Sequence, residues 1–163
     1  MLNYREATIK DINLIIKNER NIENIPFIDT WDKKEHEYAI NNNNIAYWVV
    51  EYDGKIVGHI ILENLFDYND SLFFRRIVIT DKGKGFGRYS VLYVLKFAFI
   101  KNSYHRVWLN IKEGNMVSTK LFTSLGFLKE GTSRESSKEE NGIYLSMDVY
   151  SLLSYEFNSS IRK

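Results

Sequence analysis

A glycine-rich segment in the middle of the chain is the part of the sequence that most directly suggests chemistry. Gly83, Gly85 and Gly87 follow an apolar, strand-like run, and an apolar helical pattern begins directly after them. Glycines let the backbone turn so that several N–H groups point into one space. The first N–H groups of the helix have no partner within it, and the helix dipole adds positive potential there. The segment therefore predicts an anion site that suits a pyrophosphate. Three basic side chains surround it: Lys82, Lys84 and Arg88.

Two well-known phosphate loops do not fit this turn. A P-loop ends in Gly-Lys-Ser/Thr, whereas Lys84 is followed by Gly85. The dinucleotide fingerprint has the spacing GxGxxG near the first strand, whereas residues 83–87 read GxGxG and lie in mid-chain. Taken alone, the turn is also compatible with a plain strand-to-helix connection that binds nothing, or with an unrelated nucleotide-binding enzyme.

The surrounding elements form a mixed α/β pattern. Alternating or β-rich runs predict strands at about residues 2–7, 45–52, 55–62, 72–80, 106–111, 127–134 and 143–150. Apolar periodicity predicts helices after Thr8 or Asp11 and at about residues 32–40, 88–101 and 115–125. Asp53-Gly54 predicts a hairpin, and Gly126 predicts the end of the last helix. Residues 151–163 are expected to form a short tail that is frayed from Phe157.

Length and composition favour one domain over residues 1–163. A formal net charge of +1 provides no overall field for nucleic acid or anionic lipid, so neither is expected as the main partner. The chain has no cysteine, which excludes disulfides and a cysteine nucleophile. The scattered histidines predict no metal site. No apolar run resembles a signal peptide or approaches the ~20 residues of a membrane span, so a cytoplasmic location is expected.

Several motifs in a fixed order resemble the GNAT superfamily of N-acetyltransferases, in particular its RimJ/RimL-like branch. Residues 82–87, Lys-Gly-Lys-Gly-Phe-Gly, resemble the family's Arg/Gln-x-x-Gly-x-Gly/Ala motif, with Lys82 in first place. Residues 105–109, 114–115, 121–127 and 129–131 resemble the branch's fifth strand and its Gly-Asn, Leu-Tyr-x-x-Leu-Gly-Phe and Glu-Gly segments. The N-terminal residues 4–7 and the hairpin at 53–58 also fit. The resemblance extends over about residues 2–150.

The resemblance implies an α/β (α+β) fold. Its sheet is mixed and mostly antiparallel, has six to seven strands, is splayed at the central strands, and is flanked by about four helices. It also implies that acetyl-CoA is a co-substrate, without a metal, and that its acetyl group passes directly to a primary amine in a ternary complex. The acceptor would be a small amine or a protein or peptide N-terminus. The implied cofactor-binding residues are Ile77, Val78, Ile79, Lys82, Gly83, Lys84, Gly85, Phe86, Gly87, Arg88, Asn115, Ser118 and Phe122.

Among these, the backbone of residues 77–79 would pair with the pantetheine arm, and the N–H groups of residues 83–88 would hold the pyrophosphate. A backbone N–H near Val78 would polarise the thioester carbonyl. A base must also take a proton from the acceptor ammonium.

Two departures from the family leave the catalytic acid and base open. Phe122 stands where the family has a tyrosine that protonates the thiolate, so the acid is expected to be water or a nearby hydroxyl such as Ser118. Phe73 stands where the branch often has a glutamate, which leaves Glu63 and Asp67 as candidate bases. For each of these two, a solvated loop carboxylate is the competing interpretation. The same departures motivate an alternative function, a non-catalytic sensor of acetyl-CoA or CoA.

Other candidate side chains receive a structural interpretation. His59 lies in an apolar strand and is expected to be a core residue rather than a base. An aromatic group is expected to belong mainly to the core, with the lining of an acceptor pocket as the alternative: Trp48, Phe66, Tyr68, Phe73 and Phe74. A homodimer is compatible with the sequence, although no pattern in it specifies one.

Overall fold

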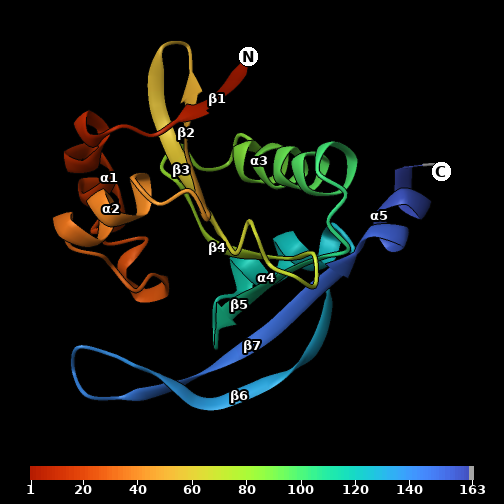
Figure 1. Ribbon diagram of the computed structural model, residues 1–163. Coiled ribbons are helices and arrows are strands. Elements are labelled where there is room, and N and C mark those ends of the chain that lie inside the picture. The colour runs from red at the N-terminus through yellow and green to blue at the C-terminus, as the bar shows by residue number, and fades with distance from the viewer. Residues whose placement is uncertain (162–163) are drawn as a thin grey trace.

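The computed structural model describes residues 1–161, which form one seven-stranded sheet with helices on both faces (Figure 1). The strands follow the order β1-β2-β3-β4-β5-β7-β6 across the sheet. Their bounds are β1 Leu2–Glu6, β2 Ile45–Tyr52, β3 Lys55–Glu63, β4 Ser71–Ile79, β5 Arg106–Lys112, β6 Leu128–Lys138 and β7 Tyr144–Leu153. Every neighbouring pair is antiparallel except β4 and β5, which are parallel. The predicted mixed, mostly antiparallel sheet is therefore confirmed.

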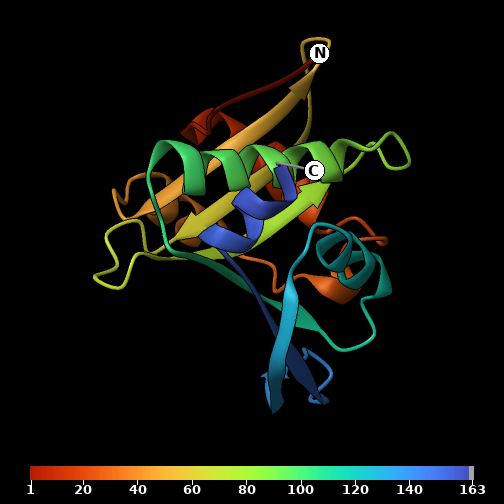
Figure 2. The same cartoon turned by 90° about the vertical axis from the view of Figure 1, so that its right-hand side faces the viewer.

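Helices lie on both faces of the sheet, and the hairpin of β6 and β7 extends beyond them (Figure 2). The helices α1 (Ile12–Glu19) and α2 (Lys33–Ile40) lie on one face. The other face carries α3 (Phe86–Leu95), which continues as a π-helix over Lys96–Lys101, together with α4 (Met116–Ser124) and α5 (Ser154–Ile161). No helix in the described part of the chain is both long and apolar enough to cross a membrane.

Local sequence signals place the helix and hairpin ends as predicted. Asp32 caps α2 by accepting a hydrogen bond from the Glu35 N–H at 2.9 Å. Asn115 caps α4 by accepting one from the Ser118 N–H at 3.1 Å. The β2–β3 hairpin turns at residues 53 and 54, both with positive φ, as a type I′ turn requires.

The core consists of two layers of buried side chains, one on each face of the β-sheet. Alternation along β2 shows how they divide: Trp48 and Val50 pack with α3, whereas Tyr47 and Val49 pack with α1 and α2. The larger core, on the α3 side, takes in most of the buried apolar residues of β4, β5 and β7. The strands are thus buried on both faces where the sheet is covered, and this is why their sequences are so apolar.

The parallel strands β4 and β5 separate soon after they begin. They pair only at Ser71 to Phe73, opposite Arg106 to Trp108. Beyond this point β4 pairs with β3 alone and β5 with β7 alone. A β-bulge in β4 leaves Arg75 without a register partner on β3, which bends the strand at the place where the two diverge. We call the separated part, 74–79 of β4 facing 109–112 of β5, the β4–β5 opening. It confirms the predicted splay of the central strands.

The C-terminal end differs from the prediction. The expectation of a short tail from residue 151 is wrong, because β7 continues to Leu153 and α5 follows from Ser154 to Ile161. Phe157, expected to begin the frayed part, is 3% exposed, and its ring lies 5.3 Å from that of Phe99. Burial of this one aromatic side chain against the π-helix that continues α3 supports the ordering of α5. Residues 162 and 163 lie outside the described residues.

Candidate acetyl-CoA site

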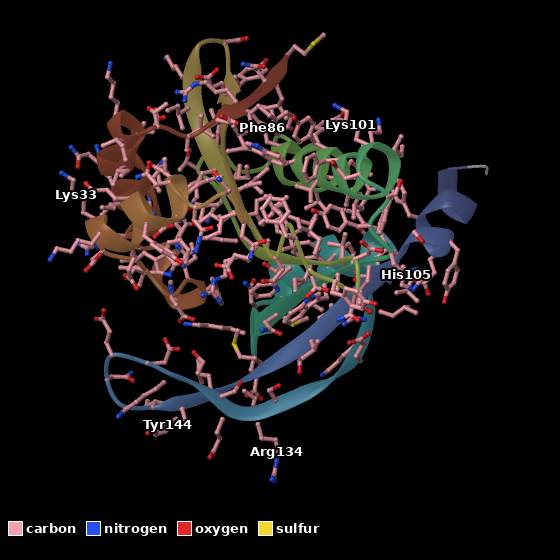
Figure 3. All side chains as sticks on the ribbon, in the orientation of Figure 1. Lys33, Phe86, Lys101, His105, Arg134 and Tyr144 are labelled. Atoms are coloured by element: carbon pink, nitrogen blue, oxygen red, sulfur yellow. The ribbon has the colours of Figure 1, made fainter. Side chains whose placement is uncertain are left out.

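The glycine turn has the geometry of an anion site. Gly83 and Gly85 have φ values of 80° and 77°, in the left-handed region that favours glycine. Gly85 is the N-cap of α3 and provides no capping side chain, unlike Asp32 and Asn115 at the other helices. The N–H groups of the first helical turn therefore have neither a helical acceptor nor a side-chain cap. Figure 3 shows Phe86 at this end of α3, beside β2 and β3.

The three basic side chains predicted around the turn are present, and each has a neighbour. Lys82 Nζ lies 3.0 Å from Glu23 of the segment between α1 and α2. Lys84 Nζ lies 2.8 Å from Asp81, which raises the pKa of the lysine. The third side chain, Arg88, donates to Ser124 Oγ of α4 at 2.9 Å. The contacts of Lys82 and Arg88 join the turn to neighbouring elements, whereas that of Lys84 stays within the turn. All three are at the surface, where a phosphate could compete for the cations.

The turn and the β4–β5 opening meet at the C-terminal ends of these central strands. The turn follows the end of β4, and α4 follows the end of β5, so the opening leads to the N-termini of both helices. The two helices are close here, because a Cβ built on Gly87 would lie 3.6 Å from Leu121 Cδ2. Asn115 uses its Oδ1 atom to cap α4 and keeps its Nδ2 group as a donor. A strand that has no partner on its β5 side, beside an uncapped helix start, fits the pantetheine and pyrophosphate of acetyl-CoA.

Phe122 is part of the core on the α3 side of this opening. It is 4% exposed and meets Phe74, the first residue of β4 without a partner on β5, edge to face with ring centroids 5.6 Å apart. It also meets Phe127 at 5.2 Å. A phenyl ring here can pack but has no proton to donate. Ser118, one helical turn before it, is half-buried and is the hydroxyl that the sequence pointed to.

One of the two candidate bases, Glu63, lies on the opposite face of the opening, because its neighbour Leu62 packs in the core on the α3 side. The Glu63 carboxylate at the end of β3 lies 3.2 Å from Arg75 Nε, at the bulge. Beside it, the ring of Phe73 stacks on that of Trp108 with centroids 4.3 Å apart. Asp67 lies in the β3–β4 loop and lines a pocket of about 490 Å³ together with Trp108. Glu63 therefore lies beside the part of β4 where the opening begins, whereas Asp67 lies farther out in a loop.

The predicted aromatic group divides in two. Trp48, Phe73 and Phe74 are buried, which confirms the core interpretation for these three. Phe66 and Tyr68 are 75% and 98% exposed, so the core interpretation is wrong for them. Both belong to the loop that carries Asp67, where the backbone turns at the surface and offers no core to pack against.

A buried charged cluster on the α1/α2 face was not predicted. The Glu19 carboxylate, fully buried, lies 2.9 Å from His59 Nε2 and 2.6 Å from Arg76 Nη1. His36 Nε2 lies 3.5 Å from the same carboxylate, and its Nδ1 is 2.8 Å from the Tyr47 hydroxyl. Burial by itself raises the pKa of Glu19, but the histidines and the Arg76 charge outweigh it and hold that pKa well below its usual range.

A pattern in the sequence of α1 could have revealed this cluster. Glu19 follows Ile12 and Ile15 at helical spacing, so an acid ends an otherwise apolar helix face. An ionised side chain on such a face needs a partner in the core. The expectation that His59 is a core residue is confirmed, since it is fully buried and its Nε2 atom is hydrogen-bonded to Glu19. Burial lowers the pKa of His59.

Comparison with known proteins agrees with this geometry. The model of the acetyltransferase (GNAT) family matches residues 16–127, and the chain belongs to that family. An uncharacterized N-acetyltransferase, the SPbeta prophage-derived YokL of Bacillus subtilis, is 30% identical over 100 residues. The match covers 61% of this chain and 56% of that protein, so the chain spans little more than half of the relative.

Solved structures show the same fold. The spermidine N-acetyltransferase of Vibrio cholerae in complex with CoA and spermine superposes with a TM-score of 0.82 and 23% identity, covering 96% of this chain and 98% of that one. A chimera of the Vibrio cholerae enzyme SpeG with hSSAT gives a TM-score of 0.83 at 21% identity, covering 96% and 98%. At this level of identity the likeness establishes the fold.

Proposed function

We propose that the chain is an acetyl-CoA-dependent N-acetyltransferase that passes the acetyl group directly to a primary amine in a ternary complex. The observation that carries the proposal is the β4–β5 opening, which lies beside a glycine turn and an uncapped start of α3. Membership of the GNAT family supports it. We further propose that the chain is one cytoplasmic domain of the RimJ/RimL-like branch, active as a monomer or homodimer, with neither nucleic acid nor membrane as partner.

The cofactor would be held mainly by backbone groups. Residues 77–79 of β4 would pair with the pantetheine arm, because β5 has moved away from them. The N–H groups of residues 83–88 would hold the pyrophosphate, with support from Lys82, Lys84 and Arg88. Asn115 Nδ2, Ser118 and Phe122 would border the thioester end from α4. Bound there, acetyl-CoA supplies an acetyl thioester whose carbonyl carbon the acceptor nitrogen attacks.

The chain would contribute positioning and proton transfers. The Val78 N–H would polarise the thioester carbonyl, and holding both reactants in line lowers the entropic barrier. Glu63 would accept the proton that the acceptor nitrogen loses, since its carboxylate faces the side opposite the cofactor helices. Ser118 or water would protonate the leaving thiolate, because Phe122 carries no acidic hydrogen. An acceptor ammonium loses two protons in all: one would pass through Glu63 to solvent, and the other replaces the proton that Ser118 or water gives to the thiolate. The products are then CoA thiol, an amide and one released proton.

The acceptor would approach from the α1/α2 face. The cofactor helices α3 and α4 occupy the other face, so a ternary complex leaves this side for the amine. A net charge of +1 provides little attraction for a strongly cationic acceptor. The structural neighbour in complex with spermine supports an amine as the class of acceptor. We therefore propose a small primary amine or a peptide N-terminus.

Thiol release with a panel of amines tests the proposal. The protein is mixed with acetyl-CoA and, in turn, butylamine, 1,4-diaminobutane, spermidine and short peptides, and the acetylated product is confirmed by mass. Time-dependent release with at least one amine is expected. Glu63→Gln should lower kcat/KM by roughly 10²-fold or more if Glu63 is the base, while Asp67→Asn should not. Ser118→Ala should lower kcat if Ser118 is the acid. Binding of acetyl-CoA without turnover for any amine would contradict the proposal and indicate a sensor instead.

A further inference from the structure

Asp29, in the segment between α1 and α2, contacts both strands that border the β4–β5 opening. Its backbone carbonyl accepts a hydrogen bond from Arg76 Nη2 of β4 at 2.5 Å. Its carboxylate Oδ1 lies 2.7 Å from Lys112 Nζ, at the end of β5. Lys112 faces the α1/α2 side because Leu109 and Ile111, which alternate with it, pack in the core on the α3 side. Asp29 therefore spans the opening on the face from which the acceptor would approach.

Lys112 is an unusually buried ammonium. Its side chain is 3% exposed, and its second partner is Glu139, in the turn after β6, at 2.8 Å. Burial favours the neutral amine, but the two carboxylates outweigh it and raise the pKa of Lys112. The lysine is therefore a cation at neutral pH. The charges of Asp29, Glu139 and Lys112 sum to −1, and without the lysine they would sum to −2.

This arrangement shows that the position between Asp29 and Glu139 holds a primary alkylammonium. The two carboxylates come from separate elements, one on each side of the end of β5, and converge on one nitrogen. An acceptor with a second amino group would present the same chemical group a few carbon atoms from its reacting nitrogen. In this chain the side chain of Lys112 already fills that position.

We propose that Lys112 determines acceptor specificity: its ammonium occupies the cation position between Asp29 and Glu139, so the site favours acceptors with one amino group over diamines and polyamines. This inference rests on the proposed function, because it requires an amine that approaches from the α1/α2 face. Removal of the lysine charge leaves two carboxylates beside the opening, and a diamine can then bind them with its distal ammonium. Lys112 thus acts through charge and occupied space and takes no part in the chemistry.

The test compares Lys112→Met with wild type and with Lys129→Met. Lys129 is a matched control, since it is also an ion-paired lysine, 2.8 Å from Asp148, but is exposed on β6. Two quantities are measured for each protein: the ratio of kcat/KM for 1,4-diaminobutane to that for butylamine, and the Kd of 1,4-diaminobutane for the CoA-saturated protein by titration calorimetry. Lys112→Gln, which keeps a hydrogen-bond donor without the charge, replaces Lys112→Met if the latter fails to fold.

Lys112→Met is expected to raise the diamine-to-monoamine ratio and to tighten diamine binding by tenfold or more. Adding Asp29→Asn, which removes one of the freed carboxylates, should reverse most of the gain, and Lys129→Met should change neither quantity. Unchanged diamine binding in folded Lys112→Met would overturn the assignment, whatever the turnover. Tighter diamine binding without turnover of any amine would support the assignment and contradict the proposed function.

Discussion

The buried Glu19 cluster makes a quantitative prediction, because Glu19→Gln removes the charge that Arg76 requires. The guanidinium is 6% exposed, lies 2.6 Å from Glu19 and faces the ring of Trp31 with 4.5 Å to its centroid. Loss of one partner of a buried ion pair costs about 3–5 kcal/mol, since the other charge stays buried. In a chain of this size each kcal/mol lowers Tm by roughly 2–4 °C, so a decrease of about 6–20 °C is expected.

A matched control separates burial from charge. Glu51→Gln breaks an ion pair with Arg5 of similar length, 2.8 Å, at a more exposed place on the sheet. An exposed pair contributes about 0–1 kcal/mol, so the control should lower Tm by only a few degrees. Both proteins are measured by thermal unfolding followed by circular dichroism. A Glu19→Gln protein as stable as Glu51→Gln would refute the assignment of the cluster as a buried ion pair.

The same cluster sets a pH dependence of stability. Because burial lowers the pKa of His59 in the folded protein, the unfolded chain binds its proton more readily. The contribution of His59 to stability is therefore present above about pH 6.5 and is lost as the pH falls below it. Glu19, whose pKa is also lowered, adds a loss below about pH 4.3. Denaturant titrations should show the free energy of unfolding decreasing from pH 7 to 5, with His59 contributing up to ~1.4 kcal/mol per pH unit. The variant His59→Gln should show a smaller decrease over the same range.

Three further predictions concern the site itself. Gly85→Ala should weaken acetyl-CoA binding at least tenfold and lower the free energy of unfolding by about 1–2 kcal/mol. The control Gly142→Ala, at a similar φ of 83° but in the distant β6–β7 turn, should lower stability without changing acetyl-CoA binding. Phe122→Tyr should raise kcat by roughly tenfold or more by adding a proton donor, and a lower kcat in a stable variant would argue against an acid at this position. Gly58→Ala would place a Cβ 2.3 Å from the Val78 carbonyl oxygen. It should therefore lower the free energy of unfolding by about 1–3 kcal/mol and kcat by up to ~10²-fold. Unchanged stability and unchanged kcat would show that β4 shifts without cost.

The sequence was sufficient where local chemistry decides the structure. The turn at Gly83 and Gly85 requires left-handed backbone that glycine provides. Asp32 and Asn115 cap the N-termini of their helices by contacts within three residues. Such features depend on neighbours along the chain and can be read from them. The mixed, mostly antiparallel sheet and the splay of its central strands followed from the family resemblance.

The unpredicted features depend on contacts between distant residues. Glu19 meets His59 and Arg76, which are 40 and 57 positions away, and no periodicity in the sequence relates them. The link of Lys112 to Asp29 and Glu139 is of the same kind. The end of β7 and α5 were missed because the stability of α5 comes from burying Phe157 against Phe99, and not from its own polar sequence.

Thermal unfolding in the presence of acetyl-CoA, CoA, ATP and NAD tests the central claim most directly. A ligand that binds only the folded protein, at about 100 times its Kd, adds ~2.7 kcal/mol and raises Tm by roughly 5–11 °C. We predict such a shift with acetyl-CoA and with CoA, and none with ATP or NAD at equal concentration. No shift with acetyl-CoA, or an equal shift with ATP, would contradict the assignment of the β4–β5 opening and its glycine turn as an acetyl-CoA site.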